Sequence, residues 1–234
     1  MALPLLLLPG ALCNDQLFQP QISFFTQQRK VIVADFSGCD SIQAMAIKIL
    51  AEAPAEFALA GLSLGGIVAF EMVRQEPQRI KKLALLDTNP GVELPEGSVI
   101  RHHQMAIIAR GGIKTLKTLV NQELLPKYAF DPEQLLRHDA VVLEMALAAG
   151  PDEFVNQWRA LEIRPDSWNT LKDIQCPVLI LCGVHDVLCN VKLHRDMAVE
   201  IKHATLEIIE DAGHLSTLDA PKQVNRALAT WLNS

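Results

Sequence analysis

A serine between two glycines is the residue of this 234-residue chain best suited to nucleophilic chemistry. Ser63 is the centre of a Gly-Leu-Ser-Leu-Gly motif that follows the apolar run Phe57–Leu62 and precedes the amphipathic segment Leu64–Gln75. Where a strand turns at once into a helix, the serine has a strained backbone, and the flanking glycines are needed because strand and helix nearly touch. The motif predicts a nucleophile elbow that exposes Ser63 at a sheet edge.

Two later residues have the right types to activate this serine. A serine hydroxyl is a weak nucleophile that needs a general base, and the base needs an acid to orient it. Asp186 follows the apolar run 177–182, and His214 follows the run 204–209. Both would therefore lie just beyond the carboxyl end of a strand, as Ser63 does. We predict a catalytic triad of Ser63, Asp186 and His214.

The elements that must position these residues alternate along the chain, which predicts a parallel sheet with crossover helices. The expected strands are 3–8, 30–36, 57–62, 80–87, 177–182 and 204–209. The expected helices are 14–27, 41–53 with Ser41 as its N-cap, 64–75 and 221–232. This pattern predicts an α/β fold.

The alternation stops between positions 92 and 166, where no strand-like run occurs. Helical segments are expected near 99–108, 113–123, 132–149 and 152–161. Glycines at 111–112 and 150 interrupt them, either as hinges or as simple loop breaks. We predict one core from residues 1–91 and 167–234, with residues 92–166 inserted as a helical lid.

The elbow, the Gly-x-x-Asp turn ending at Asp186 and the Gly-His turn ending at His214 resemble those of the α/β-hydrolase superfamily. The likeness extends over nearly the whole chain. Within the superfamily the chain is similar to small carboxylesterases such as pimeloyl-ACP methyl ester esterases and 3-oxoadipate enol-lactonases. The resemblance implies a mainly parallel sheet of about six strands flanked by helices, with a four-helix lid, and without the first two antiparallel strands of larger members.

The acid of the triad has a competitor in Asp87. Asp87 ends the strand that follows the elbow, where some hydrolases place their acid. We favour Asp186 because it follows the later strand, as in the esterases that the chain resembles.

An oxyanion hole needs two backbone N–H groups aimed at the developing negative charge. One is expected from Leu64, which follows the nucleophile. The other is expected from the loop after the first strand, where relatives often have His-Gly-x and this chain has Pro9 in place of the histidine. The resemblance to that motif makes Ala11 the matching donor, with Leu12 as the alternative.

These features predict a serine hydrolase that cleaves a carboxylic ester or a related acyl compound and needs no cofactor. Lactonases, thioesterases and carbon–carbon hydrolases use similar triads, so the sequence does not separate them. No metal site is expected, because the neighbouring His102 and His103 would point to different sides of a helix. The alternative from another class is a small-molecule binding protein that has kept the fold and lost the chemistry. The presence of all three triad residue types argues against it.

Charge limits the classes of partner. The net charge is −6 and the charged residues are spread along the chain, which argues against a nucleic-acid-binding function and leaves small molecules and proteins as partners. The first part of the lid carries five cations, Arg101, Arg110, Lys114, Lys117 and Lys127, against the single acid Glu123. An acyl carrier protein could dock there, as the resemblance to the pimeloyl-ACP esterases suggests, although a solvated helix face is the favoured interpretation.

The cysteines and the N-terminal residues indicate the compartment. The five cysteines are odd in number and form no C-x-x-C pair, which favours a reduced, cytoplasmic protein. The apolar run near the N-terminus has no lysine or arginine before Arg29 and is too short to span a bilayer. We interpret it as the first buried strand and expect no membrane association.

Overall fold

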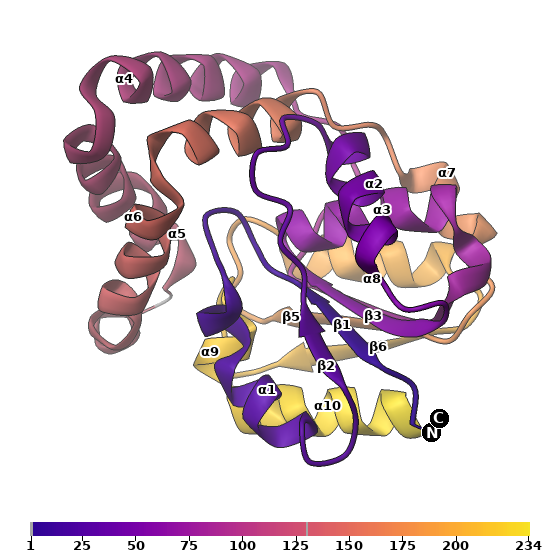
Figure 1. The fold of residues 1–234 in the computed structure, drawn as a ribbon. Coiled ribbons are helices and arrows are strands. Elements are labelled where there is room, and N and C mark those ends of the chain that lie inside the picture. The colour runs from indigo at the N-terminus through magenta and orange to yellow at the C-terminus, as the bar shows by residue number, and fades with distance from the viewer. Residues whose placement is uncertain (1, 130) are drawn as a thin grey trace.

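The computed structural model describes residues 2–129 and 131–234, and a six-stranded sheet lies at its centre (Figure 1). The strands are β1 (Leu5–Leu8), β2 (Val31–Val33), β3 (Phe57–Leu62), β4 (Ile80–Leu86), β5 (Val178–Gly183) and β6 (Ala204–Ile209). Their order in the sheet is β2-β1-β3-β4-β5-β6, and every neighbouring pair is parallel. The predicted fold class is confirmed.

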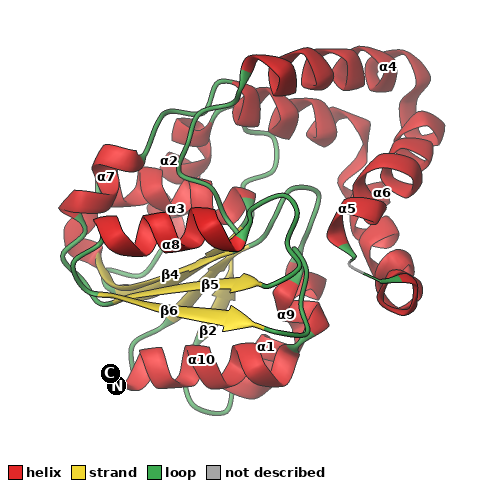
Figure 2. Cartoon of the chain, turned by 180° about the vertical axis from the view of Figure 1, so that it is seen from behind, coloured by secondary structure: helices red, strands yellow, loops and turns green. Residues whose placement is uncertain are grey.

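Helices cover both faces of the sheet (Figure 2). On one face lie α1 (Gln19–Phe25) and α10 (Pro221–Asn233), and on the other lie α2 (Ile42–Glu52), α3 (Leu64–Gln75), α7 (Trp168–Asp173) and α8 (Val191–Glu200). Short helical turns are Asp15–Phe18, Pro77–Arg79 and α9 (Ser216–Asp219). All residues of β1, β3 and β5 are buried, because helices pack on each side of a parallel sheet.

Apart from α7, the helices between β4 and β5 lie beyond the carboxyl ends of the strands (Figure 2). They are α4 (Pro95–Leu119), a π-helical segment (Val120–Leu124), α5 (Leu125–Tyr128) and α6 (Pro132–Glu162). Gly112, with φ 57°, breaks α4, and Gly150, with φ 84°, breaks α6. The breaks fall at the predicted glycines because a left-handed backbone is strained for other residues. None of the described helices is both long and apolar enough to cross a membrane.

Several predicted boundaries were wrong. The strand expected at 30–36 is only Val31–Val33, an edge strand whose one neighbour is β1. The helix expected at 14–27 is divided into the turn Asp15–Phe18 and α1, which has Pro20 in its first turn. The short helices α7 and α9 were not predicted. The helix expected at 41–53 is present as α2, and the Ser41 side chain caps it by accepting a hydrogen bond from the Ala44 N–H at 3.3 Å.

Candidate active site

The elbow joins β3 to α3 with no connecting residue except Ser63. The serine has φ 53° and ψ −115°, which is the strained backbone that the motif predicts. A Cβ atom on Gly61 would lie 2.4 Å from the Gly65 carbonyl oxygen, and one on Gly65 would lie 2.1 Å from the Leu8 carbonyl oxygen. Because these neighbours are backbone atoms, only glycine fits at either position.

A chain of hydrogen bonds connects the elbow to α8. The Thr88 hydroxyl donates to the Ser63 carbonyl oxygen at 2.7 Å, and the Thr88 N–H donates to His194 Nε2 at 3.2 Å. His194 Nδ1 lies 3.0 Å from the Asn190 carbonyl oxygen, to which it donates. Burial lowers the pKa of His194, so the ring stays neutral and Nε2 stays an acceptor. Sequence reasoning missed Thr88 and His194, because nothing local in the sequence links them to Ser63.

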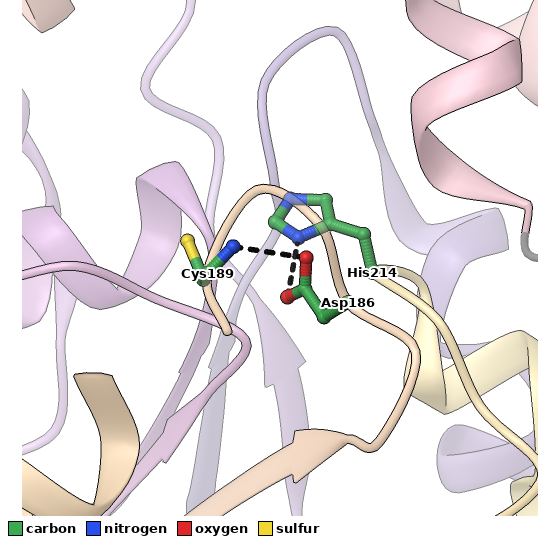
Figure 3. A group of neighbouring side chains, drawn as sticks. All are labelled: Asp186, Cys189 and His214. Atoms are coloured by element: carbon green, nitrogen blue, oxygen red, sulfur yellow. Dashed lines mark hydrogen bonds and ion pairs between the residues drawn. The ribbon is translucent and has the colours of Figure 1, made fainter. Parts of the chain in front are cut away.

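The three predicted triad side chains form one continuous hydrogen-bonded array. His214 Nε2 lies 3.0 Å from Ser63 Oγ, and His214 Nδ1 lies 2.9 Å from Asp186 Oδ2. The other Asp186 oxygen accepts a hydrogen bond from the backbone N–H group of Leu188 at 2.8 Å. It also accepts one from the backbone N–H group of Cys189 at 2.9 Å (Figure 3). Asp186 and His214 are each only 3% exposed. This arrangement fixes one tautomer of His214 and leaves Nε2 free to take a proton from Ser63.

Asp87, the alternative acid, contacts other groups. Its Oδ1 accepts a hydrogen bond from the Gly183 N–H at 2.9 Å, and its Oδ2 is hydrogen-bonded to the Ser216 hydroxyl. Burial, together with the nearby charge of Asp186, raises the pKa of Asp87 well above its ordinary value. The structure therefore pairs His214 with Asp186, and Asp87 connects β4 to β5 and to the turn after His214.

The two candidates for the second oxyanion donor differ in what their N–H groups do. The Leu12 N–H donates to Gln157 Oε1 at 2.7 Å, so it is already used. Ala11 lines the same cavity as Ser63 and His214. Leu64 is the first residue of α3, where a backbone N–H has no acceptor within the helix. This geometry favours Ala11 and Leu64 as the donor pair.

Gln157 belongs to α6 and was not predicted to act at this site. Its side chain is 4% exposed, and its Nε2 donates to Glu153 Oε1 at 2.8 Å. The second Glu153 oxygen accepts a hydrogen bond from the Gly38 N–H at 2.7 Å. Two side chains of α6 thus hold two loops of the sheet, one of them the loop that carries Ala11. With 145 positions separating Gln157 from Leu12, no sequence pattern could have indicated the contact.

Asp186, Cys189 and His214 are the one group of metal-ligand types found together among the described residues, with ligand atoms within 4.8 Å of one another (Figure 3). Their donor chemistry does not suit a metal ion. Asp186 and His214 bind each other, and burial raises the pKa of the Cys189 thiol, which keeps it protonated. We interpret this cluster as part of the hydrogen-bonded array.

A cavity of about 320 Å³ opens above Ser63 and His214. This volume is at the small end of the range for ligand pockets, roughly 300–1,000 Å³. Its other walls come from the helices between β4 and β5, which contribute Arg101, Tyr128 and Trp158. The Tyr128 ring stacks on the His214 imidazole with centroids 5.5 Å apart, which shields the array from solvent.

The model of one protein family, described as the alpha/beta hydrolase family, matches residues 5–227. The chain belongs to the alpha/beta hydrolase family. The two esterase groups that the sequence resembles, 3-oxoadipate enol-lactonases and pimeloyl-[acyl-carrier protein] methyl ester esterases, are also among its relatives. The predicted resemblance is confirmed.

Relatives within the alpha/beta hydrolase family are enzymes. The chain is 26% identical to (E)-2-((N-methylformamido)methylene)succinate hydrolase of Acinetobacter baylyi, over 99% of this chain and 90% of the relative. It is 25% identical to a carboxylesterase of Bacillus subtilis, over 97% and 79% respectively. A solved esterase structure from Thermogutta terrifontis, with malate bound, superposes with a TM-score of 0.89 at 28% identity and covers 100% of this chain and 90% of its own. The prediction of a hydrolytic enzyme is confirmed.

Proposed function

We propose that this member of the alpha/beta hydrolase family cleaves carboxylic esters through a Ser63–His214–Asp186 triad and an acyl-enzyme. One observation carries the proposal: Ser63 Oγ, the His214 ring and Asp186 Oδ2 are joined by hydrogen bonds of 3.0 and 2.9 Å at the base of a cavity. Both relatives named as esterases support an ester as the substrate. Lactones and acyl thioesters fit the same chemistry and belong in the substrate panel.

In the first step Ser63 Oγ attacks the acyl carbon while its proton passes to His214 Nε2. The negative charge of Asp186 stabilises the imidazolium that forms. The N–H groups of Leu64 and Ala11 bind the developing oxyanion. His214 then gives its proton to the leaving alcohol. A water molecule, deprotonated by the same imidazole, attacks the acyl-enzyme; the acid is released as His214 returns the proton to Ser63 Oγ.

Residues 92–166 are proposed as a lid that closes the cavity from above, with residues 1–91 and 167–234 as the core. Tyr128 supports this division, because it belongs to the segment between β4 and β5 and covers the catalytic histidine. The breaks at Gly112 and Gly150 are the proposed hinges.

Replacement of Ser63 by alanine tests the nucleophile. Without the attacking oxygen, turnover of 4-nitrophenyl acetate should fall by roughly 10⁶-fold, to the background rate. Circular dichroism of Ser63→Ala should match that of the wild type, because the elbow backbone is unchanged. Hydrolysis that persists in the folded variant would contradict the assignment.

A fluorophosphonate probe separates the enzyme from the alternative of a binding protein. An activated Ser63 should form a covalent adduct within minutes, detectable by mass spectrometry on the peptide that contains it. Ser63→Ala is the control and should not react. A wild-type protein that does not react would favour the binding-protein alternative.

A cytoplasmic location and an acyl carrier protein as partner stay predictions. Arg110, Lys114 and Lys117 are exposed on α4, as a docking surface for an acidic protein would require. Arg101 and Lys127, the other two cations of the predicted basic patch, line the cavity instead. The predicted basic patch is therefore divided into three cations on the exposed surface of α4 and two cations that line the cavity.

A further inference from the structure

The lining of the cavity above Ser63 carries more positive than negative charge. Its cations are Arg101, Lys127 and Arg164, and its one carboxylate is Glu93. A small cavity with such a lining attracts anions, because the walls exclude most of the water that would screen the charge.

Arg164 is fully used by the protein. Its side chain donates to the backbone oxygens of Gly91, at 2.8 Å, and Val92, at 3.1 Å. It also donates to Glu93 Oε2 at 2.9 Å and is 8% exposed. Arg164 therefore fixes the segment after β4, and few of its guanidinium N–H groups are free to bind a ligand.

Arg101 is held in place but only partly used. Its Nε donates to Glu93, and its Cζ lies 5.4 Å from the centroid of the Trp158 ring. Among the residues that the structure describes, no acceptor pairs with its two terminal amino groups, and its side chain is 21% exposed. A guanidinium oriented by a ring and a carboxylate, with a free pair of donors, is suited to bidentate binding of a second carboxylate.

Lys127 adds a second cation with free donors to the same cavity. Lys127 lines the cavity and directly precedes Tyr128, the residue that stacks on His214. Within the described part of the chain its ammonium group has no acidic partner. Its side chain is exposed, which suits a group that meets the ligand at the entrance of the cavity.

We propose that Arg101 and Lys127 form a carboxylate-binding subsite, so that the substrate is a small ester or lactone that also carries a free carboxylate. The proposal rests on the proposed function, because it places the carboxylate in the cavity above a nucleophilic Ser63. Apolar lining residues such as Ile100 and Leu188 would contact the carbon chain between the two groups. Arg101 is expected to contribute more than Lys127 to binding the carboxylate, because it is preoriented and less exposed to water.

Two esters of matched shape test the subsite. Mono-4-nitrophenyl glutarate carries the carboxylate, and 4-nitrophenyl glutaramate replaces it with a neutral amide. After subtraction of the spontaneous rates, wild-type kcat/KM should favour the carboxylate by about 10- to 100-fold, the range expected for charged hydrogen bonds. Raising the salt concentration should reduce this preference. Equal kcat/KM values for the two esters would overturn the subsite and leave the esterase assignment intact.

Variants assign the preference to residues. Arg101→Gln should remove most of the preference through a higher KM for the carboxylate ester, with the amide ester little affected. Arg101→Lys keeps the charge but not the planar guanidinium, so it should retain part of the preference for the carboxylate ester. Lys127→Gln should have a smaller effect. Arg110→Gln, which removes an exposed cation of α4 outside the cavity, is the matched control and should change nothing. An Arg101→Gln variant that is folded and keeps the full preference would overturn the proposal.

A binding measurement keeps the subsite testable if the esterase assignment fails. Ser63→Ala should bind glutarate in a calorimetric titration, and Ser63→Ala with Arg101→Gln should bind it at least about tenfold more weakly. Glutaramide, the neutral analogue, should bind neither protein measurably. Glutarate binding that is absent, or unchanged by Arg101→Gln, would overturn the subsite whatever the outcome of the fluorophosphonate experiment.

Discussion

The sheet edge and the helices between β4 and β5 face each other across one cavity, yet their polar side chains are held in different ways. At the sheet edge the side chains of Asp186 and His214 are almost completely buried and paired with each other or with backbone groups. In the helices, Arg101 and Lys127 keep donors that the described residues do not use. From this difference we expect the sheet edge to carry the chemistry and the helices to select the substrate.

Gln157 crosses this division. It belongs to α6 but donates to and accepts from groups that order the oxyanion loop, through the Leu12 N–H and Glu153. We therefore expect the helices to contribute to transition-state stabilisation as well as to substrate choice. Effects of mutations on kcat and on KM distinguish the two contributions.

Apart from Ser63→Ala, the largest effect is expected at the sheet edge, from Asp186→Asn. The amide cannot stabilise the imidazolium and favours the wrong tautomer of His214, so kcat should fall by about 10⁴-fold. Asp87→Asn is the matched control, because Asp87 is equally buried but bonds to Gly183 and Ser216. Steady-state assays with 4-nitrophenyl acetate compare the kcat values of the two variants. A larger loss in Asp87→Asn would assign the acid to Asp87 instead.

An intermediate effect is expected from Gln157→Leu. Loss of one oxyanion-hole donor costs about 10²- to 10³-fold in kcat, and loosening the loop that carries the Ala11 donor should cost less, about 10-fold. KM should change little, because Gln157 is not among the residues that line the cavity above Ser63. Asn156→Leu, at the preceding position of α6, is the control. An effect of Gln157→Leu on KM alone would show that the residue shapes the cavity rather than the oxyanion loop.

The smallest effect is expected on the outer surface of α4. Lys114→Glu combined with Lys117→Glu should slow hydrolysis of an ester carried on acyl carrier protein by about 3- to 10-fold at low salt, through slower association. The same ester as a free methyl ester should be hydrolysed at the wild-type rate. Equal rates on the carrier-bound ester before and after the change would remove the carrier protein as a partner.

Local sequence was sufficient where a few neighbouring residues decide the backbone. The elbow is such a case, because Gly61, Ser63 and Gly65 combine with an apolar run before and an amphipathic run after, and the bounds of β3 and α3 were predicted correctly. β6 was also predicted correctly from its own residues. β2 was predicted too long, because the length of an edge strand depends on how far its single neighbour continues to pair.

Residue types and their order also predicted which side chains meet at the sheet edge. Parallel strands all end on one side, so residues placed just after β3, β5 and β6 are brought together by topology alone. The sequence by itself could therefore name Ser63, Asp186 and His214. Both Asp186 and Asp87 follow strands of the same sheet, so the choice of Asp186 depended on the resemblance to esterases. The 2.9 Å contact between Asp186 and His214 supports that choice.

The surroundings of the array were decided by the tertiary structure alone. The Gln157–Leu12 bond and the pairing of Glu93 with Arg101 and Arg164 join residues whose local sequence gives no sign of a partner. Such contacts depend on how the helices between β4 and β5 pack over the sheet, and periodicity gives the apolar face of a helix but not its neighbour. The residues thus determined the fold and the reactive groups, and packing decided which donors are used and which are left for a substrate.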